Sequence, residues 1–245
     1  MTHALIGYPS LKLSVEIVLA MEKGGADFIE LQIPFSDPLA DGPTIMRASE
    51  KALEQGTKVR DAFYVANILK RKISTPLLLM AYYNTIFKCG IEKFCRKAKA
   101  AGVSGLIVPD MPLEEELREH FSRSARESNL CVIRVVAPVS TDERLRKNAT
   151  AAQGFVYCSA RQGITGAHQQ LLPHVVSYLK KTRKFFKIPL AVGFGISKPE
   201  HLTKLSSSVD IVVVGSAIID LINRSEEKTV PHRVAVFVRS LKEEC

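Results

Sequence analysis

The chain has 245 residues, of which 46% are hydrophobic and 24% charged, and it carries a formal net charge of +9. This length and apolar content suffice for one large core. No linker or low-complexity stretch divides the sequence, so we expect a single domain over residues 1–245. No run approaches the roughly 18 apolar residues that a membrane-spanning helix needs, which argues against an integral membrane protein.

The N-terminus and the cysteines indicate a soluble, cytoplasmic protein. The opening residues lack the basic and apolar regions of an export signal. The five cysteines include no CxxC pair and lie partly inside apolar runs, as reduced buried thiols do.

Basic residues cluster at positions 70–72 and 180–184, at the ends of helix-like segments. Cations at such places face water and complement the helix dipole. Nucleic-acid binding is the alternative, but no aromatic residues interleave with the basic ones as a single-strand platform requires. We therefore expect no nucleic-acid partner and no membrane partner, and the positive charge equally suits a small anionic substrate.

Short apolar runs alternate with amphipathic segments of helical length, which is typical of a parallel sheet with crossover helices. The predicted strands are Ala4–Ile6, Phe28–Ile33, Leu77–Ala81, Gly105–Val108, Leu130–Val136, Gly154–Cys158, Leu190–Val192 and Ile211–Val214. The predicted helices include Leu13–Lys23, Val59–Lys72, Ile91–Ala100, Leu113–Glu127, Gln169–Lys181, Lys198–Leu205 and Pro231–Lys242. Eight such units predict an α/β fold, a single (β/α)₈ TIM barrel, because an open doubly wound sheet, the alternative, normally has about five or six strands.

Glycine-containing turns follow the last three predicted strands, where TIM barrels often hold phosphate. They are Gln162–Gly166, Val192–Ser197 and Val214–Ala217. Glycine lets backbone N–H groups approach an anion, and a helix N-terminus adds its positive dipole end. A single turn of this kind is usually only structural. Together they predict a phosphate site after strands seven and eight, formed by the N–H groups of Gly166, Gly195, Gly215 and Ser216, with the Ser216 hydroxyl assisting.

Two carboxylates are the candidate catalytic groups. Alternation along the second strand puts Glu30 inside the barrel, where an ionised carboxylate is costly unless it is paired. Asp41 lies in the following loop, which three prolines stiffen. The alternatives are an internal hydrogen-bonded acid for Glu30 and a turn or N-cap acid for Asp41. Two acids over a phosphate pocket indicate acid–base chemistry on a sugar phosphate.

The stretch from Glu30 to Ile45, ELQIPFSDPLADGPTI, closely resembles the signature of tryptophan synthase α subunits. Further segments resemble the same family in order and spacing: Gly7–Pro9, Tyr82–Asn84, Val108–Asp110, Gly163–Gly166, Val192–Ile196 and Val214–Ala217. The resemblance covers nearly the whole chain. It implies a lyase of tryptophan biosynthesis that splits indole-3-glycerol phosphate into indole and glyceraldehyde 3-phosphate by retro-aldol cleavage.

By position, the resemblance implies that Glu30 moves protons to and from the substrate and that Asp41 accepts the indole N–H, stabilising the cationic intermediate. Thr165 matches a lid residue that closes onto Asp41 before reaction. Tyr157 matches a tyrosine near the catalytic glutamate. The residues that match the apolar wall around the indole are Ile45, Met80, Tyr82 and Phe194.

The resemblance also implies a β subunit as partner in an α2β2 complex, with Asp37 and Pro38 at the contact. That subunit consumes the indole by means of pyridoxal phosphate, so no cofactor is expected in this chain. No metal is expected either, because the histidines show no metal-ligand grouping.

Two positions depart from the family pattern, and alternation along the second strand puts the side chain of one of them, Gln32, inside the barrel. Gln32 stands where the family usually has glycine, one step above Glu30, and His3 stands where a hydrophobic residue is common. The sequence also begins almost at its first strand, which leaves room for a start further upstream. A glutamine that crowds the substrate motivates a rival hypothesis, an α-like subunit that only activates its β partner. A second rival is a sugar-phosphate isomerase or epimerase barrel, which the loop Pro34–Thr44 does not support.

Overall fold

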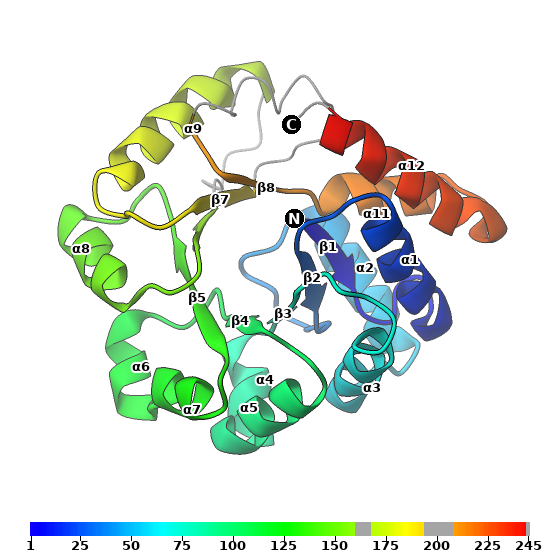
Figure 1. Ribbon diagram of the computed structural model, residues 1–245, viewed down its shortest axis with the longest axis horizontal. Coiled ribbons are helices and arrows are strands. Elements are labelled where there is room, and N and C mark those ends of the chain that lie inside the picture. Colours follow the sequence, from blue (N-terminus) through cyan, green and yellow to red (C-terminus); the bar gives the residue numbers. More distant parts are fainter. Residues whose placement is uncertain (160–167, 194–207, 244–245) are drawn as a thin grey trace.

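Eight parallel strands pair in chain order around a closed barrel (Figure 1). The computed structural model describes residues 1–159, 168–193 and 208–243. The strands are β1 Thr2–Leu5, β2 Ile29–Gln32, β3 Leu77–Met80, β4 Gly105–Ile107, β5 Cys131–Val136, β6 Val156–Ser159, β7 Leu190–Gly193 and β8 Ile211–Val213. A parallel bridge between Thr2 and Val214 joins the first strand to the end of the last. All eight predicted strands are confirmed, and the closure excludes the open sheet.

Helices surround the strands as an outer ring (Figure 1). They are α1 Leu11–Lys23, α2 Pro43–Glu54, α3 Val59–Leu69, α4 Tyr83–Cys89, α5 Ile91–Ala100, α6 Leu113–Glu119, α7 Phe121–Glu127, α8 Asp142–Ala151, α9 His168–Arg183, α11 Ser216–Asn223 and α12 Val230–Glu243, with a 3₁₀ turn at Glu227–Thr229. None of the helices in the described ranges combines the length and the apolar character needed to cross a bilayer.

The helix predictions were wrong at one place and incomplete at others. The predicted helix Leu113–Glu127 is two helices, because His120 adopts a left-handed conformation with φ 54° and ends the first. The prediction did not include α8, which buries only Leu145 and therefore shows little apolar periodicity. It also missed α2, which begins at Pro43 inside the proline-rich loop, since proline suits the first turn of a helix. The predicted helix Lys198–Leu205 lies outside the described residues.

Two apolar clusters lie on the two faces of the barrel wall. Alternate residues of β2, such as Ile29 and Leu31, pack outward against the helices in the larger cluster. The smaller cluster fills the barrel interior and includes Leu78, Met80 and Tyr82. Because side chains alternate along a strand, a polar residue placed between outward-facing positions of β2 must lie in the interior.

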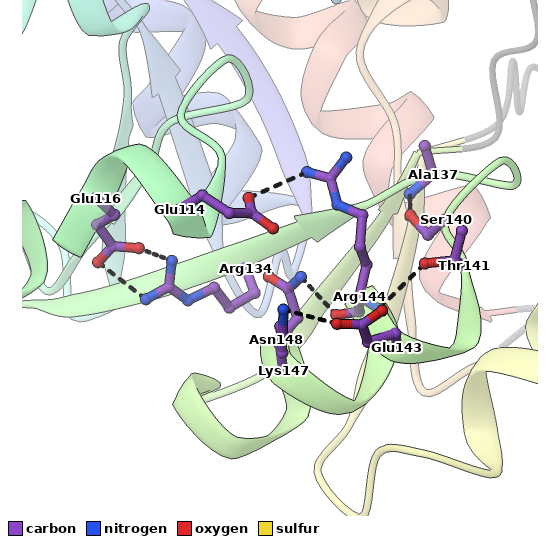
Figure 2. A network of polar contacts seen from close by, with 10 residues as sticks. All are labelled: Glu114, Glu116, Arg134, Ala137, Ser140, Thr141, Glu143, Arg144, Lys147 and Asn148. Atoms are coloured by element: carbon purple, nitrogen blue, oxygen red, sulfur yellow. Dashed lines mark hydrogen bonds and ion pairs between the residues drawn. The ribbon is translucent and has the colours of Figure 1, made fainter. Parts of the chain in front are cut away.

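A buried ion pair fastens the outer side of β5 to α6 (Figure 2). Ile133 and Val135 belong to the interior cluster, so Arg134 between them faces the helices. Arg134 binds both carboxylate oxygens of Glu116, and the two side chains are 6% and 3% exposed. Arg134 also donates to the Ser122 hydroxyl at 2.9 Å. The pair therefore replaces apolar packing at this position of the wall.

We predict that Arg134→Met lowers the free energy of unfolding by about 3–5 kcal/mol, because it leaves the Glu116 carboxylate buried without its cation. Urea unfolding followed by circular dichroism measures the change. The double variant Arg134→Met/Glu116→Leu should recover most of it. The matched control is Arg123→Met, whose ion pair with Glu127 is exposed and contributes about 0.5 kcal/mol. Equal losses for the two arginine variants would contradict the prediction.

Candidate active site

Strand β2 places Glu30 and Gln32 in the barrel interior. Glu30 is in register with Leu78 of β3, and Gln32 is in register with Met80. Both β3 residues belong to the interior cluster, and register partners in a sheet point to the same face. Glu30 and Gln32 are 3% and 1% exposed. The inward orientation predicted for Glu30 is therefore confirmed.

The buried environment of Glu30 favours its protonated form. Burial raises the pKa of Glu30 above its usual 4.5, and the negative charge of Asp41 adds to the rise while His3 opposes it. Its buried Oε2 has no hydrogen-bond partner among the described residues. The alternative of a fully hydrogen-bonded structural acid is therefore disfavoured, and the carboxyl group is suited to donating a proton.

Asp41 is tied to the interior by two side chains that converge on one oxygen. Its Oδ2 accepts a hydrogen bond from Gln32 Nε2 at 2.5 Å and another from the Tyr82 hydroxyl at 3.1 Å. The N-cap of α2 is Gly42, one residue later. Asp41 is therefore not the N-cap of α2, and its carboxylate is directed at the polar groups of the barrel mouth.

The loop that carries Asp41 is fastened at two further points. The backbone N–H of Ala40 donates to the Tyr82 hydroxyl at 3.0 Å. The Ser49 hydroxyl on α2 bonds both the N–H and the carbonyl of Phe35, at 2.8 and 2.9 Å. The Phe35 ring stacks on Tyr82 with 5.0 Å between ring centroids. These contacts hold the loop between β2 and α2 over the interior cluster.

Tyr157 lies on the opposite side of the interior, on β6. It is half-buried and in register with Ala191, which belongs to the interior cluster. Burial raises the pKa of Tyr157 well above 10, and the charges of Glu30 and Asp41 add to the rise, so its hydroxyl stays a neutral donor. A Cβ at Gly193 would lie 2.6 Å from the Tyr157 hydroxyl oxygen, so glycine is needed there for the approach.

Helix α11 starts directly after β8, as predicted for the phosphate end. Gly215 is its N-cap residue and Ser216 its first residue, and both are half-buried. The first N–H groups of a helix have no acceptor within the helix. A Cβ at Gly215 would lie 3.2 Å from the Nδ1 atom of His3, so this turn lies next to the residues of β1.

The remaining predicted residues fall in three groups. Met80 and Tyr82 lie together in the interior cluster, whereas Ile45 is half-buried on α2 and packs against the outer cluster. In the β2–α2 loop Asp37 is exposed and Pro38 is buried. Four predicted residues lie outside the described part of the chain: Thr165, Gly166, Phe194 and Gly195.

Comparison with known proteins identifies the family. A model of the family described as tryptophan synthase alpha chain matches residues 1–245. This chain belongs to the tryptophan synthase alpha chain family. It is 43% identical to the alpha chain of Desulfotalea psychrophila over 242 residues, which are 99% of this chain and 93% of that protein. It is 42% identical to the alpha chain of Dehalococcoides mccartyi over 241 residues, which are 98% of this chain and 92% of that protein.

Solved structures of the family have the same fold. The tryptophan synthase alpha-subunit of Pyrococcus furiosus superposes with a TM-score of 0.91 at 34% identity, covering 99% of this chain and 96% of that one. A tryptophan synthase chain of Mycobacterium tuberculosis gives 0.89 at 32% identity, covering 99% and 90%. The chain is thus a lyase of tryptophan biosynthesis that acts on indole-3-glycerol phosphate. The isomerase rival is set aside, and the purely regulatory rival is not favoured.

The sequence did not reveal the contacts that Gln32, His3, Phe35 and Ser49 make around the candidate site. The side chain of Gln32, the residue that motivated the regulatory rival, contacts both Asp41 and His3. Alternation along β1 could have indicated that His3 faces inward as Gln32 does. The contacts of Phe35 and Ser49 had no signal in the sequence, because they depend on how the loop folds back over α2.

We predict that the free energy of unfolding of the unsubstituted chain falls relative to that of Glu30→Gln as the pH rises from 5 to 8. A carboxyl group with a raised pKa binds its proton more tightly in the folded state, so folding stability is complete below pH 4.5 and is lost as the pH rises through the folded pKa. Glutamine does not titrate and shows no such loss. In the unsubstituted chain, each pH unit between the unfolded and the folded pKa of Glu30 costs about 1.4 kcal/mol of stability. Urea unfolding at both pH values measures the difference. Glu50→Gln, on the exposed side of α2, is the matched control. A difference that does not change with pH would contradict the raised pKa.

Proposed function

We propose that Glu30 and Asp41 are the catalytic carboxylates with which this chain cleaves indole-3-glycerol phosphate by a retro-aldol reaction. The observation that carries the proposal is the arrangement of the two acids. Glu30 is buried, faces inward and has a raised pKa, while Asp41 is fastened above the same interior. One acid is thus suited to giving up a proton and the other to receiving a hydrogen bond.

The proposed reaction begins with transfer of the Glu30 proton to C3 of the indole ring. The ring nitrogen then carries positive charge, which the Asp41 carboxylate stabilises by accepting the indole N–H. The Glu30 carboxylate next takes the proton of the hydroxyl group on the carbon attached to C3. The bond between that carbon and C3 breaks, its electrons return to the ring, and glyceraldehyde 3-phosphate leaves as the aldehyde. Glu30 ends protonated, as it began.

The proposed substrate pocket uses the other interior residues. The ring of Tyr82 and the side chain of Met80 supply an apolar wall for the indole. The neutral hydroxyl of Tyr157 is available to orient the glycerol chain or the Glu30 carboxyl. For the phosphate we propose the backbone N–H groups at the start of α11, from Gly215 and Ser216, with the Ser216 hydroxyl. The proposed roles of Thr165, Gly166, Phe194 and Gly195 stay predictions.

We further propose that a pyridoxal-phosphate-containing β subunit receives the indole, in an α2β2 complex. The β2–α2 loop is suited to a partner contact because Asp37 and Leu39 are exposed, Leu39 by 91%. An open cleft lies beside it, lined by Phe35, Val59, Asn84, Thr85, Lys88 and Cys89. Because Asp41 is in the same loop, a partner bound there would act directly on the position of a catalytic residue.

Glu30→Gln and Asp41→Asn should each reduce indole release from indole-3-glycerol phosphate by at least about 100-fold, because each removes a group that acts in the transition state. Release is measured with and without the β subunit, and Glu50→Gln serves as the control with an exposed carboxylate. Full activity in either variant would refute the assigned role. A chain that activates its partner without releasing indole would revive the regulatory hypothesis.

Asp37→Ala should raise the Kd for the β subunit about tenfold, because it removes an exposed charge at the proposed contact. Titration calorimetry with the purified β subunit measures the change. The control is Asp27→Ala, an exposed aspartate just before β2, at the opposite end of the barrel from the loop. Equal Kd values for the two variants would locate the contact elsewhere.

A further inference from the structure

A chain of hydrogen bonds runs from β1 through β2 to Asp41 in the β2–α2 loop. The Nε2 atom of His3 lies 2.7 Å from Oε1 of Gln32, and Nε2 of Gln32 donates to Oδ2 of Asp41 at 2.5 Å. His3 and Gln32 are both buried, with 4% and 1% of their surfaces exposed. We refer to His3 and Gln32 together as the relay.

The carboxylate of Asp41, at the end of this chain, sets the direction of both hydrogen bonds. An ionised Asp41 carboxylate can only accept, so the amide NH₂ of Gln32 must face it. The amide oxygen of Gln32 then faces His3, and Nε2 of His3 must carry a proton. Loss of either residue leaves the other with an unpaired polar atom in a buried place, which makes the two residues interdependent.

The other ring nitrogen of His3 faces the phosphate end of the site. Nδ1 is buried and has no hydrogen-bond partner among the described residues. It lies 3.2 Å from the position that a Cβ would take on Gly215, the N-cap residue of α11. The imidazole therefore fills the space between the turn at Gly215 and the amide of Gln32, and the ring has little room to swing away.

We propose that His3 and Gln32 are positioning residues that hold the Asp41 carboxylate where it accepts the indole N–H. The inference rests on the role proposed above for Asp41. Asp41 lies on a loop in which Leu39, two residues earlier, is exposed to solvent, so its carboxylate needs fixed donors to stay in one orientation. Tyr82 supplies one donor, and the relay supplies a second that is anchored in the barrel wall.

The test compares the affinities of two unreactive probes, an indole with a three-carbon phosphate chain at C3 and its N-methyl counterpart. The ratio of the two affinities measures how well the protein accepts a hydrogen bond from the indole N–H. If His3 and Gln32 only stabilised the fold, their substitution would leave this ratio unchanged. Calorimetry should give a preference of about tenfold to a hundredfold for the N–H probe in the unsubstituted chain, as expected for a hydrogen bond to a charged group. Asp41→Ala should abolish that preference.

The relay variants then decide the inference. Gln32→Met keeps the side-chain volume and removes both hydrogen bonds, and His3→Leu removes the donor to Gln32. Both should lose most of the preference, whereas His3→Gln, which can still donate to Gln32, should keep it. Each variant is checked for cooperative thermal unfolding, and if Gln32→Met does not fold, the two His3 variants carry the test.

Three results would overturn the inference. Retention of the full preference in Gln32→Met and His3→Leu, with loss in Asp41→Ala, would refute the relay and leave the proposed function intact. Loss in His3→Gln to the level of His3→Leu would show that the donated hydrogen bond is not what matters. Equal affinity of the unsubstituted chain for the two probes would remove the role of Asp41, and the relay with it.

Discussion

Glu30 lies inside a barrel of apolar side chains, where ionising a carboxylate costs free energy unless cations or hydrogen-bond donors compensate for the lost water. In the described part of the chain its Oε2 has no such donor. The protonated form is favoured as a result, and this is the form that the proposed role of Glu30 as a proton donor requires. Burial of Glu30 therefore underlies both its proposed role as a proton donor and the predicted loss of folding stability as the pH rises.

Asp41, the second acid, has polar surroundings. Asp41 receives two directed hydrogen bonds on one oxygen, from Gln32 and Tyr82, so that it is held rather than left in apolar surroundings. Two carboxyl groups in one site thus have different environments, which supports the different roles proposed for them, a proton donor and a charge-stabilising acceptor. Tyr157 stays neutral under the influence of both, which keeps its hydroxyl available as a donor.

Inward and outward residues of the strands have different surroundings. Outward residues join the large cluster beneath the helices, and one outward residue of β5, Arg134, instead forms a buried ion pair with Glu116 of α6. Inward residues of β1, β2, β3 and β6 surround the candidate site. Because neighbouring positions on one strand face different surroundings, the inward positions can change without repacking the helices. The presence of His3 and Gln32 at two inward positions, bonded to each other, is consistent with that freedom.

Alternating apolar runs and their number were enough to predict eight parallel strands, because burial of a strand on both faces leaves a plain mark in the sequence. The inward direction of Glu30 also followed from the sequence alone, since a period of two decides which face each residue takes. The helix boundary at His120 and the bonds of Gln32 to His3 and Asp41 did not follow. A hydrogen bond depends on where two side chains meet in space, and His3, Gln32 and Asp41 come from three segments that only the closed barrel brings together. Sequence thus determined the fold and the direction of the first acid, whereas tertiary structure decided how the second acid is held.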